Sequence, residues 1–139
     1  MAQSQQFEIE LVHQEKPLCV GKFLLSPGED DPRRCILTLE CTLGHFQATD
    51  WNYFDALCEI REQLEPLGWR PRCYGACEDV YPSNMCRDMG QGMVAYRNEI
   101  GRPAAQEHLV ETFGTSAEIE PASVVEQRAF FQRWMKSPR

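Results

Sequence analysis

Three segments in the first third of the chain alternate between apolar and polar residues. They are residues 7–11, 18–25 and 35–43. Alternation is the period of a half-buried β-strand, and it is clearest in the third segment, where Cys35, Leu37 and Leu39 face one way. The polar loop 26–34, which contains two prolines, precedes that segment. We therefore predict an antiparallel meander with one face on the core.

The apolar period changes to that of a helix at two places. The first helix is predicted from an N-cap at Asp50 through about Leu64, where a Pro-x-Gly sequence ends it. Its buried stripe is predicted to be Trp51, Phe54, Leu57, Cys58, Arg61 and Leu64. The last helix begins at an S-x-x-E capping box formed by Ser123 and Glu126. Its buried side is marked by Val124, Gln127, Trp134 and either Phe130 or Phe131.

Three further segments between the two helices are predicted to be strands. They are Arg72–Glu78, Met93–Ile100 and His108–Phe113. The predicted order is then βββαβββα, with no repeat and no internal linker in the 139 residues. We predict a single α+β domain over residues 1–139, in which two helices cover one face of a largely antiparallel sheet of about six strands. A helix on each face of the sheet is the alternative.

The stretch Asp79–Gly92 follows neither period, so its residues serve the backbone or a surface. Ser83 or Asn84 is suited to cap one short helical turn, and Gly90 is suited to a left-handed exit from that turn. We predict a compact, ordered connection that displays a set of polar and aromatic side chains. These are Asp79, Tyr81, Arg87 and Asp88. A connection that is ordered only for packing is the alternative.

The composition limits which class of partner and which cellular compartment are expected. The formal net charge of −7 argues against a general nucleic-acid binder, because such a protein neutralises phosphates with Lys and Arg. The charge suits a partner that is basic or has a basic cleft. The first six residues contain no apolar run, so we expect no signal peptide, and no stretch reaches the ~20 apolar residues of a membrane helix. Seven cysteines without an export signal indicate reduced thiols in the cytoplasm.

The cysteine spacing gives only a weak indication of a metal site. Cys73-x-x-x-Cys77 resembles half a zinc site, which Cys86 or His108 would have to complete. On an extended strand, residues four apart lie ~13 Å from each other, whereas two sulfurs on one zinc lie within ~4 Å. Only a sharp bend at Gly75 would bring the pair together. We therefore predict that the cysteines pack as core residues, and we predict no metal and no cofactor.

Catalytic residues are equally hard to assign. Cys86 lies near a predicted helix start, which favours a thiolate. The candidates for its base are His13, His45 and His108, and nothing in their spacing singles one out. Gly90-x-Gly92 lacks the third glycine of a nucleotide-binding fingerprint and leads into a predicted strand. The acidic run Glu29, Asp30 and Asp31 lies at a loop tip, where solvated carboxylates are common. An enzyme that uses Cys86 or Asp79 with a histidine stays as an alternative.

The central motif resembles a known family. Residues 74–85 read Tyr-Gly-Ala-Cys-Glu-Asp-Val-Tyr-Pro-Ser-Asn-Met, followed by Arg87-Asp88-Met89-Gly90 and Ala95-Tyr96-Arg97. This is similar to small bacterial proteins with a Gly-Ala-x-x-Asp-Val-Tyr-Pro-Ser-x-Met core, then Met-Gly-x-Gly and a tyrosine-bearing strand. The C-terminal Gln-Arg-Ala-Phe-Phe of that family also resembles residues 127–131. The resemblance covers about the C-terminal half of the chain and does not extend to the N-terminal meander.

The resembling proteins are associated with immunity functions encoded beside Rhs-type polymorphic toxins. The resemblance implies a cytoplasmic inhibitor that binds and blocks one cognate toxin domain, and it provides no catalytic residue. An ADP-ribosyltransferase or a nuclease would both suit an acidic inhibitor. We predict that the contact is made by Glu29, Asp30, Asp31, Asp79, Tyr81, Arg87 and Asp88. A scaffold subunit that pairs with another copy is a further alternative.

Overall fold

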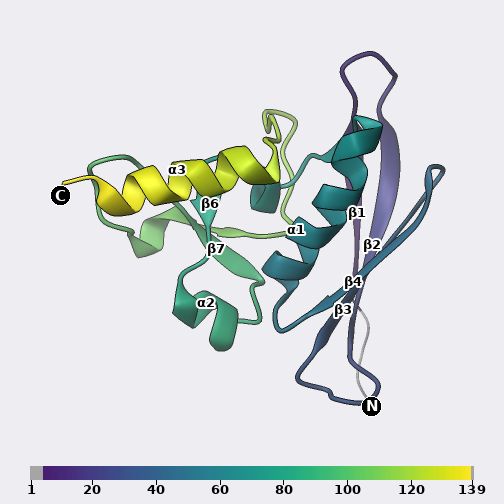
Figure 1. The fold of residues 1–139 in the computed structure, drawn as a ribbon, viewed down its shortest axis with the longest axis horizontal. Helices are drawn as coiled ribbons and strands as arrows, with labels where there is room; N and C mark the ends of the chain where they lie inside the picture. Colours follow the sequence, from purple (N-terminus) through teal and green to yellow (C-terminus); the bar gives the residue numbers. More distant parts are fainter. Residues whose placement is uncertain (1–4, 139) are drawn as a thin grey trace.

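The computed structural model describes residues 5–138. Residues 1–4, where no export signal is expected, and residue 139 lie outside this range. The described chain has eight strands and three α-helices, which confirms the prediction of an α+β fold with antiparallel pairing (Figure 1). The elements are β1 (Gln5–Val12), β2 (Cys19–Pro27), β3 (Cys35–Cys41), β4 (Gly44–Asp50), α1 (Tyr53–Leu64), β5 (Arg70–Pro71), β6 (Val80–Tyr81), α2 (Asn84–Asp88), β7 (Val94–Arg97), β8 (Leu109–Glu111) and α3 (Val124–Lys136), with short 3-10 turns η1 (Glu65–Leu67), η2 (Tyr74–Ala76) and η3 (Gln106–His108).

The strands form two sheets and not the single sheet that was predicted. The larger has the order β4-β3-β2-β1-β5, and the smaller has the order β6-β7-β8. The predicted meander is present, with Phe23 of β2 opposite Phe7 of β1 and Leu39 of β3. Strand β4 was not predicted, and the strand predicted over residues 35–43 ends two residues earlier, at Cys41. The chain instead turns after Cys41, and Leu43 lies in that turn with 36% of its surface exposed.

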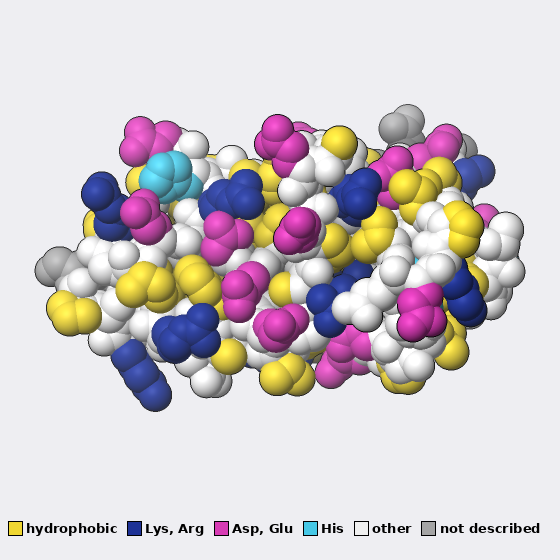
Figure 2. Space-filling view, turned by 90° about the horizontal axis from the view of Figure 1, so that it is seen from above, with side chains coloured by type: hydrophobic (Ala, Val, Ile, Leu, Met, Phe, Trp, Pro, Cys, Tyr) yellow, Lys and Arg dark blue, Asp and Glu magenta, His cyan; other side chains and the backbone are white. Residues whose placement is uncertain are grey.

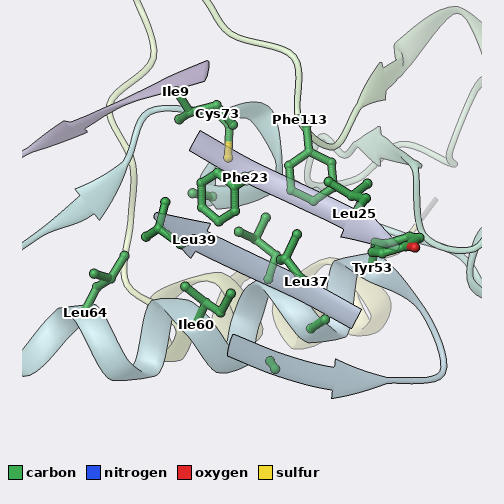
Figure 3. Close-up of a cluster of buried hydrophobic side chains, with 14 of the residues drawn as sticks. Ile9, Phe23, Leu25, Leu37, Leu39, Tyr53, Ile60, Leu64, Cys73 and Phe113 are labelled. Carbon is green, nitrogen blue, oxygen red and sulfur yellow. The ribbon is translucent and has the colours of Figure 1, made fainter. Parts of the chain in front are cut away.

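The alternating residues of the meander bury one continuous apolar layer under α1. Side chains from β2 and β3 face Ile60 and Leu64 of α1 (Figure 3). The strand residues in this layer are Ile9, Leu11, Phe23, Leu25, Cys35, Leu37, Leu39 and Ala48. Burying one such aliphatic side chain contributes about 1.5–3 kcal/mol, so this layer is the main source of stability in this half of the molecule.

Helix α1 is buried on two sides, and eight of its 12 residues are buried. Leu57 faces the layer under the large sheet, whereas Phe54 and Cys58 pack with Val124 at the start of α3. The helix begins two residues later than predicted, because Asn52, and not Asp50, is its N-cap. That side chain accepts a hydrogen bond from the backbone amide of Asp55 over 2.8 Å.

The segment Arg72–Glu78 is not a strand, contrary to the prediction. The chain leaves the edge of the large sheet after β5 and turns through η2. A Cβ at Gly75 would lie 2.8 Å from side-chain atoms of both Leu57 and Thr112, which real Cβ contacts do not show. Only glycine lets the backbone approach α1 this closely, so the chain bends here.

A buried polar network joins α1, η2 and α3. Arg61, only 1% exposed, donates through Nη1 to Gln127 Oε1 over 2.6 Å and through Nη2 to the Ala122 carbonyl over 3.0 Å. The two N–H groups of Gln127 Nε2 are shared among three carbonyl oxygens, those of Gly75, Cys77 and Val80, which lie 2.8–2.9 Å from the nitrogen. The acceptors of both Arg61 and Gln127 in this network are neutral oxygens. The network therefore satisfies the irregular backbone around η2 and β6 with side chains from two helices.

Candidate partner-binding surface

The central stretch is ordered as predicted around a short helix, and its exit differs from the prediction. Ser83 caps α2 by accepting from the Cys86 amide over 3.0 Å. The left-handed positions are Gln91 and Gly92, with φ of 54° and 71°, and not Gly90. A Cβ at Gly92 would lie 2.7 Å from Asn52 Oδ1, so glycine is needed where this turn meets the start of α1.

Tyr81 and Arg87 are held by the fold and are only partly exposed. The Tyr81 ring stacks on Phe131 at 4.1 Å and meets the edge of Phe54 at 5.3 Å. The Arg87 guanidinium lies 5.1 Å from the Tyr81 ring centroid and pairs with Asp55 of α1 at 3.4 Å. Tyr81 therefore belongs mainly to the packing between α1 and α3, while Arg87 fastens α2 to α1.

The outer side of α2 is the exposed part of the central stretch. Asp88 is exposed there, as predicted. Met85 and Met89 are also exposed, Met89 at 81%. Methionine side chains are flexible and polarisable, and they suit surfaces that adapt to a partner. Neither methionine is among the contact residues predicted from the sequence.

Asp79 lies apart from the other residues predicted in the central stretch. Its carboxylate pairs with Arg97 Nε at 2.9 Å, and the Arg97 guanidinium lies 5.7 Å from the centroid of the Tyr74 ring. Asp79 precedes the first strand of the small sheet, whereas Arg87 and Asp88 lie on α2 beyond it. The structure therefore assigns Asp79 to a different surface from that of α2.

The acidic tip between β2 and β3 is a folded turn. Asp31 accepts hydrogen bonds from the Arg33 backbone amide and side chain at 2.9–3.0 Å, and these bonds hold the pKa of Asp31 below its usual value. Glu29 and Asp30 are exposed and have no basic partner within 4.0 Å in residues 5–138. The tip therefore presents the unpaired carboxylates of Glu29 and Asp30 beside the carboxylate of Asp31, which its bonds to Arg33 hold in place.

Trp51 packs with the two arginines that follow the acidic tip. The Arg34 guanidinium lies 4.4 Å from its ring centroid and that of Arg33 lies 6.0 Å away, while 57% of Trp51 remains exposed. Its neighbour Tyr53 donates its backbone amide to the Gln91 carbonyl over 2.7 Å. Figure 1 shows α2 and the β2–β3 loop at the same end of the molecule, on either side of the start of α1.

We call this region the α1-end surface. It comprises Glu29, Asp30, Asp31, Arg33, Arg34, Trp51, Met85, Arg87, Asp88 and Met89. Trp51 was wrongly predicted to lie on the buried stripe of α1. The sequence signal that would have corrected this is Asn52 followed three residues later by Asp55, a spacing like that of a capping box, which leaves Trp51 outside the helix.

The net charge is spread over the face visible in Figure 2. Asp and Glu side chains are interspersed there with Lys and Arg, and neither sign occupies a large continuous area. The net charge of −7 therefore does not by itself define a binding surface. Local arrangements, such as the Arg–Trp stack at the α1-end surface, are more informative.

The groups considered for catalysis are not brought together. Cys86 is buried, the His13 ring packs on Trp69 at 4.9 Å, and His45 lies 3.5 Å from Glu40. Among residues 5–138, neither Cys86 nor Asp79 shares a hydrogen bond with a histidine.

The cysteines pack mainly in the interior, as predicted, although one premise of that prediction was wrong. Cys73 and Cys77 lie on a bend and not on an extended strand, and the Cys77 thiol donates to the Cys73 carbonyl over 3.8 Å. Burial raises the pKa of Cys73 to about 12 and also raises that of Cys77, which disfavours the thiolate that zinc requires. Within residues 5–138, no group of three His, Cys, Asp or Glu side chains is arranged to hold a metal ion.

Comparison with known proteins assigns no family. No family model and no curated protein sequence matches this chain. Within residues 5–138, every helix is too short or too polar to cross a bilayer.

Proposed function

We propose that this protein is a cytoplasmic immunity protein that binds and neutralises one cognate polymorphic toxin domain. The resemblance of residues 74–97 and 127–131 to immunity proteins encoded beside Rhs-type toxins supports this function. The α1-end surface supports it independently, because its exposed groups are of the kind that anchor protein interfaces. Blocking a toxin requires a preorganised complementary surface and no catalytic residue.

Trp51 is the observation that carries the proposal. Tryptophan and arginine are the residues most enriched among interface hot spots, and here a tryptophan is exposed with arginines on its ring. The Asp31–Arg33 pairs hold the adjacent loop in shape. Little side-chain entropy remains to be lost when a partner covers the ring, so the surface is preorganised for binding.

The carboxylates of the tip have a different role in this proposal. Glu29 and Asp30 are exposed and unpaired among the described residues, so they attract a basic partner from a distance. The active-site clefts of nucleases and of ADP-ribosyltransferases bind anionic substrates, so either toxin class would offer such a basic surface. Rim charges of this kind mainly change the association rate, whereas an exposed anchor that the partner covers, such as Trp51, mainly changes the dissociation rate.

The proposal is tested with the toxin domain encoded next to the gene. The wild-type protein is expected to protect cells that express this domain and to bind it in biolayer interferometry. Trp51→Ala is expected to weaken binding on the order of 10–100-fold through a faster dissociation rate. Leu67→Ala is the matched control, since Leu67 is 51% exposed on a turn outside the α1-end surface.

Two further variants test two separate points. The first asks whether the acidic tip speeds association, and the second asks whether the protein acts as an inhibitor or as an enzyme. Reversing Glu29 and Asp30 to lysine is expected to lower the association rate and to flatten its dependence on salt. Cys86→Ala is expected to retain protection, because an inhibitor needs no nucleophile. If the parent protein does not bind the neighbouring toxin domain, the proposed function is wrong. Loss of protection in Cys86→Ala with unchanged folding and affinity would favour an enzyme instead.

A further inference from the structure

The large sheet ends in a strand that has no further strand beside it among the described residues. This strand is β4, which lies outermost in the order β4-β3-β2-β1-β5 and is seven residues long. The other strands that end a sheet, β5, β6 and β8, have only two or three residues. Unpaired backbone groups on a long edge strand are a template for pairing with another chain.

Alternate residues of β4 direct their backbone groups away from β3. The Gln47 carbonyl accepts a hydrogen bond from the side chain of Gln63 on α1 over 3.3 Å, so it points out of the ladder with β3. In an antiparallel pair the residues two positions away share this orientation, and these are His45 and Thr49. All three residues are exposed. Among the described residues their backbone amides have no hydrogen-bond partner.

The β4 edge lacks the features that usually protect an edge strand. Its register with β3 continues without a bulge from one end to the other, and its sequence contains no proline and no lysine. Two side chains cover carbonyl groups instead: Gln63 lies on Gln47, and Arg34 Nη2 lies 3.5 Å from the Thr49 carbonyl. Both bonds are exposed and long for a hydrogen bond, so the backbone amides of an added strand can replace them.

The β4 edge is continuous with the α1-end surface. Trp51 directly follows Asp50, the last residue of β4. The Arg34 side chain that bonds to Thr49 also lies 4.4 Å from the centroid of the Trp51 ring. A partner that covers Trp51 therefore reaches the end of β4, and its chain can continue along the strand without crossing another element of the sheet.

The charge beside the edge favours a basic segment. The Asp50 carboxylate neighbours Glu59 of α1, and Glu59 Oε2 is buried without a hydrogen-bond partner among the described residues. Neither carboxylate has a basic group within 4.0 Å in residues 5–138. A cationic side chain on the α1 side of an added strand would relieve the repulsion between them. A second copy of this chain carries the same carboxylates and a net charge of −7, which opposes self-association.

We propose that an extended, basic segment of a protein partner adds to the large sheet along β4. Its backbone pairs with His45, Gln47 and Thr49, and one of its cationic side chains lies beside Asp50 and Glu59. Strand addition of this kind derives its affinity from main-chain hydrogen bonds. That the segment belongs to the toxin domain rests on the proposed function. The capacity of the edge to take up a basic strand does not, and it is measured separately.

The first measurement uses NMR on the ¹⁵N-labelled protein. In the free protein the amides of His45, Gln47 and Thr49 are expected to exchange with solvent quickly, and those of Phe46 and Ala48, which face β3, slowly. The acetylated, amidated peptide Thr-Lys-Val-Lys-Val-Lys-Thr is expected to bind on the order of millimolar and to shift the three outward amides. The same peptide with glutamate in place of lysine is expected to cause no such shifts. Slow exchange of the outward amides in the free protein, no shifts with the lysine peptide, or equal shifts with both peptides would overturn the proposal.

Two substitutions at one position separate the backbone from the side chain. Gln47→Pro removes the outward N–H and leaves the ladder with β3 intact, because proline is tolerated where an edge N–H faces solvent. Gln47→Ala removes the same side chain and keeps the N–H. The peptide shifts are expected to disappear in Gln47→Pro and to persist in Gln47→Ala. Loss of the shifts in both variants would assign binding to the side chain and reject backbone pairing. Urea unfolding checks that both variants fold, and the exchange rates of the unmodified protein decide the question if Gln47→Pro does not.

The toxin domain completes the test. If it protects the three outward amides, and if Gln47→Pro binds it about tenfold or more weakly than Gln47→Ala does, the toxin supplies the strand. If the toxin binds and these amides stay unprotected, the toxin assignment of the edge is wrong and the proposed function stands. If the toxin does not bind the parent protein, the proposed function is wrong, and the peptide titration still decides whether the edge takes up a basic strand. Dimers that protect the same amides without any partner would assign the edge to a second copy and reject a basic partner.

Discussion

The two halves of this molecule, which share α1, are held together by different interactions. The first half, the large sheet with α1, is a layer of interlocking apolar side chains with few buried polar groups. The second half, which contains the small sheet, α2 and α3, has strands of two, four and three residues. Its backbone is organised largely by the side chains of Arg61 and Gln127.

The first half is specified by periodicity. A slip of one residue between two strands would move the whole buried set to the solvent face, so the register of β1, β2 and β3 follows from the alternation. No single side chain decides the arrangement, because the apolar layer is continuous. The loss of one contact therefore weakens this half without changing its topology.

The second half is specified by particular hydrogen bonds. Three carbonyl groups of an irregular segment accept hydrogen bonds from the Gln127 amide nitrogen. The Gln127 amide oxygen accepts a hydrogen bond from the buried guanidinium of Arg61. Buried polar networks are stabilising when most of their members are satisfied; here both terminal nitrogens of Arg61 have acceptors, and its Nε atom has none among the described residues. The comparison shows how an irregular chain obtains one conformation without long strands: a few buried polar side chains replace the backbone ladder.

The largest effect is expected where this network is cut. Gln127→Ala removes the donor to the Gly75, Cys77 and Val80 carbonyls and the nearest acceptor of Arg61. The free energy of unfolding is expected to fall by about 3–5 kcal/mol, since buried polar and charged groups each lose one partner. Arg61 keeps its bonds to the Gly75 and Ala122 carbonyls, and the Cys77 carbonyl keeps the bond from the Val80 amide. Hydrogen exchange is expected to show the greatest loss of protection in residues 74–81, with β2 and β3 less affected.

A matched control is available on the same helix. Gln132 is exposed, so Gln132→Ala is expected to change the free energy of unfolding by no more than about 0.5 kcal/mol. Equal exchange in both halves after Gln127→Ala would contradict the distinction between them. It would show that the network is only one more contribution to a single cooperative unit.

The corresponding change in the first half is Leu37→Ala. Leu37 is fully buried in the layer under α1, and its truncation leaves a cavity, so a loss of about 3 kcal/mol is expected. Urea unfolding measures this loss, and hydrogen exchange is expected to accelerate over both halves, because α1 is common to them. Leu43→Ala, at the exposed turn after β3, is the control, and a comparable loss there would contradict the assignment of the core.

The sequence predicts these two halves unequally, for a physical reason. Alternation in β1–β3 and the capping box of α3 are local signals, and the structure contains both. The strand predicted over residues 72–78 was wrong, because its conformation depends on Gln127, which lies about 50 positions away along the chain. Local propensity does not carry such information.

The candidate surfaces differ in the same way. The exposure of Glu29, Asp30 and Asp88 could be predicted from their polarity and loop positions. The exposure of Trp51 could not be predicted once the helix start was placed two residues too early. The pairing of Arg87 with Asp55, and the separation of Asp79 from α2, depend on how α1 packs against the second half, and no local pattern reports this.

The smallest effect concerns a charge at the edge of the apolar layer. Glu59 of α1 has a buried Oε2 without a hydrogen-bond partner among the described residues. Burial, together with the neighbouring Asp50 carboxylate of β4, raises the pKa of Glu59 to about 7. Its proton is therefore held more tightly in the folded protein than in the unfolded chain, whose glutamates titrate near the ordinary value of 4.5.

The sign of the pH dependence follows from this difference. Between about pH 4.5 and pH 7 the folded state binds more protons than the unfolded state at this residue, so its contribution to stability decreases as the pH rises. Glu59→Gln mimics the protonated form and is expected to be more stable than the wild type at pH 8, by less than about 1 kcal/mol because the group is partly solvated. At pH 5 the two proteins are expected to unfold at nearly the same urea concentration. If the difference in stability between Glu59→Gln and the wild type is the same at both pH values, the ionised Glu59 carboxylate is not destabilising. Its repulsion with the Asp50 carboxylate then does not weaken the first half.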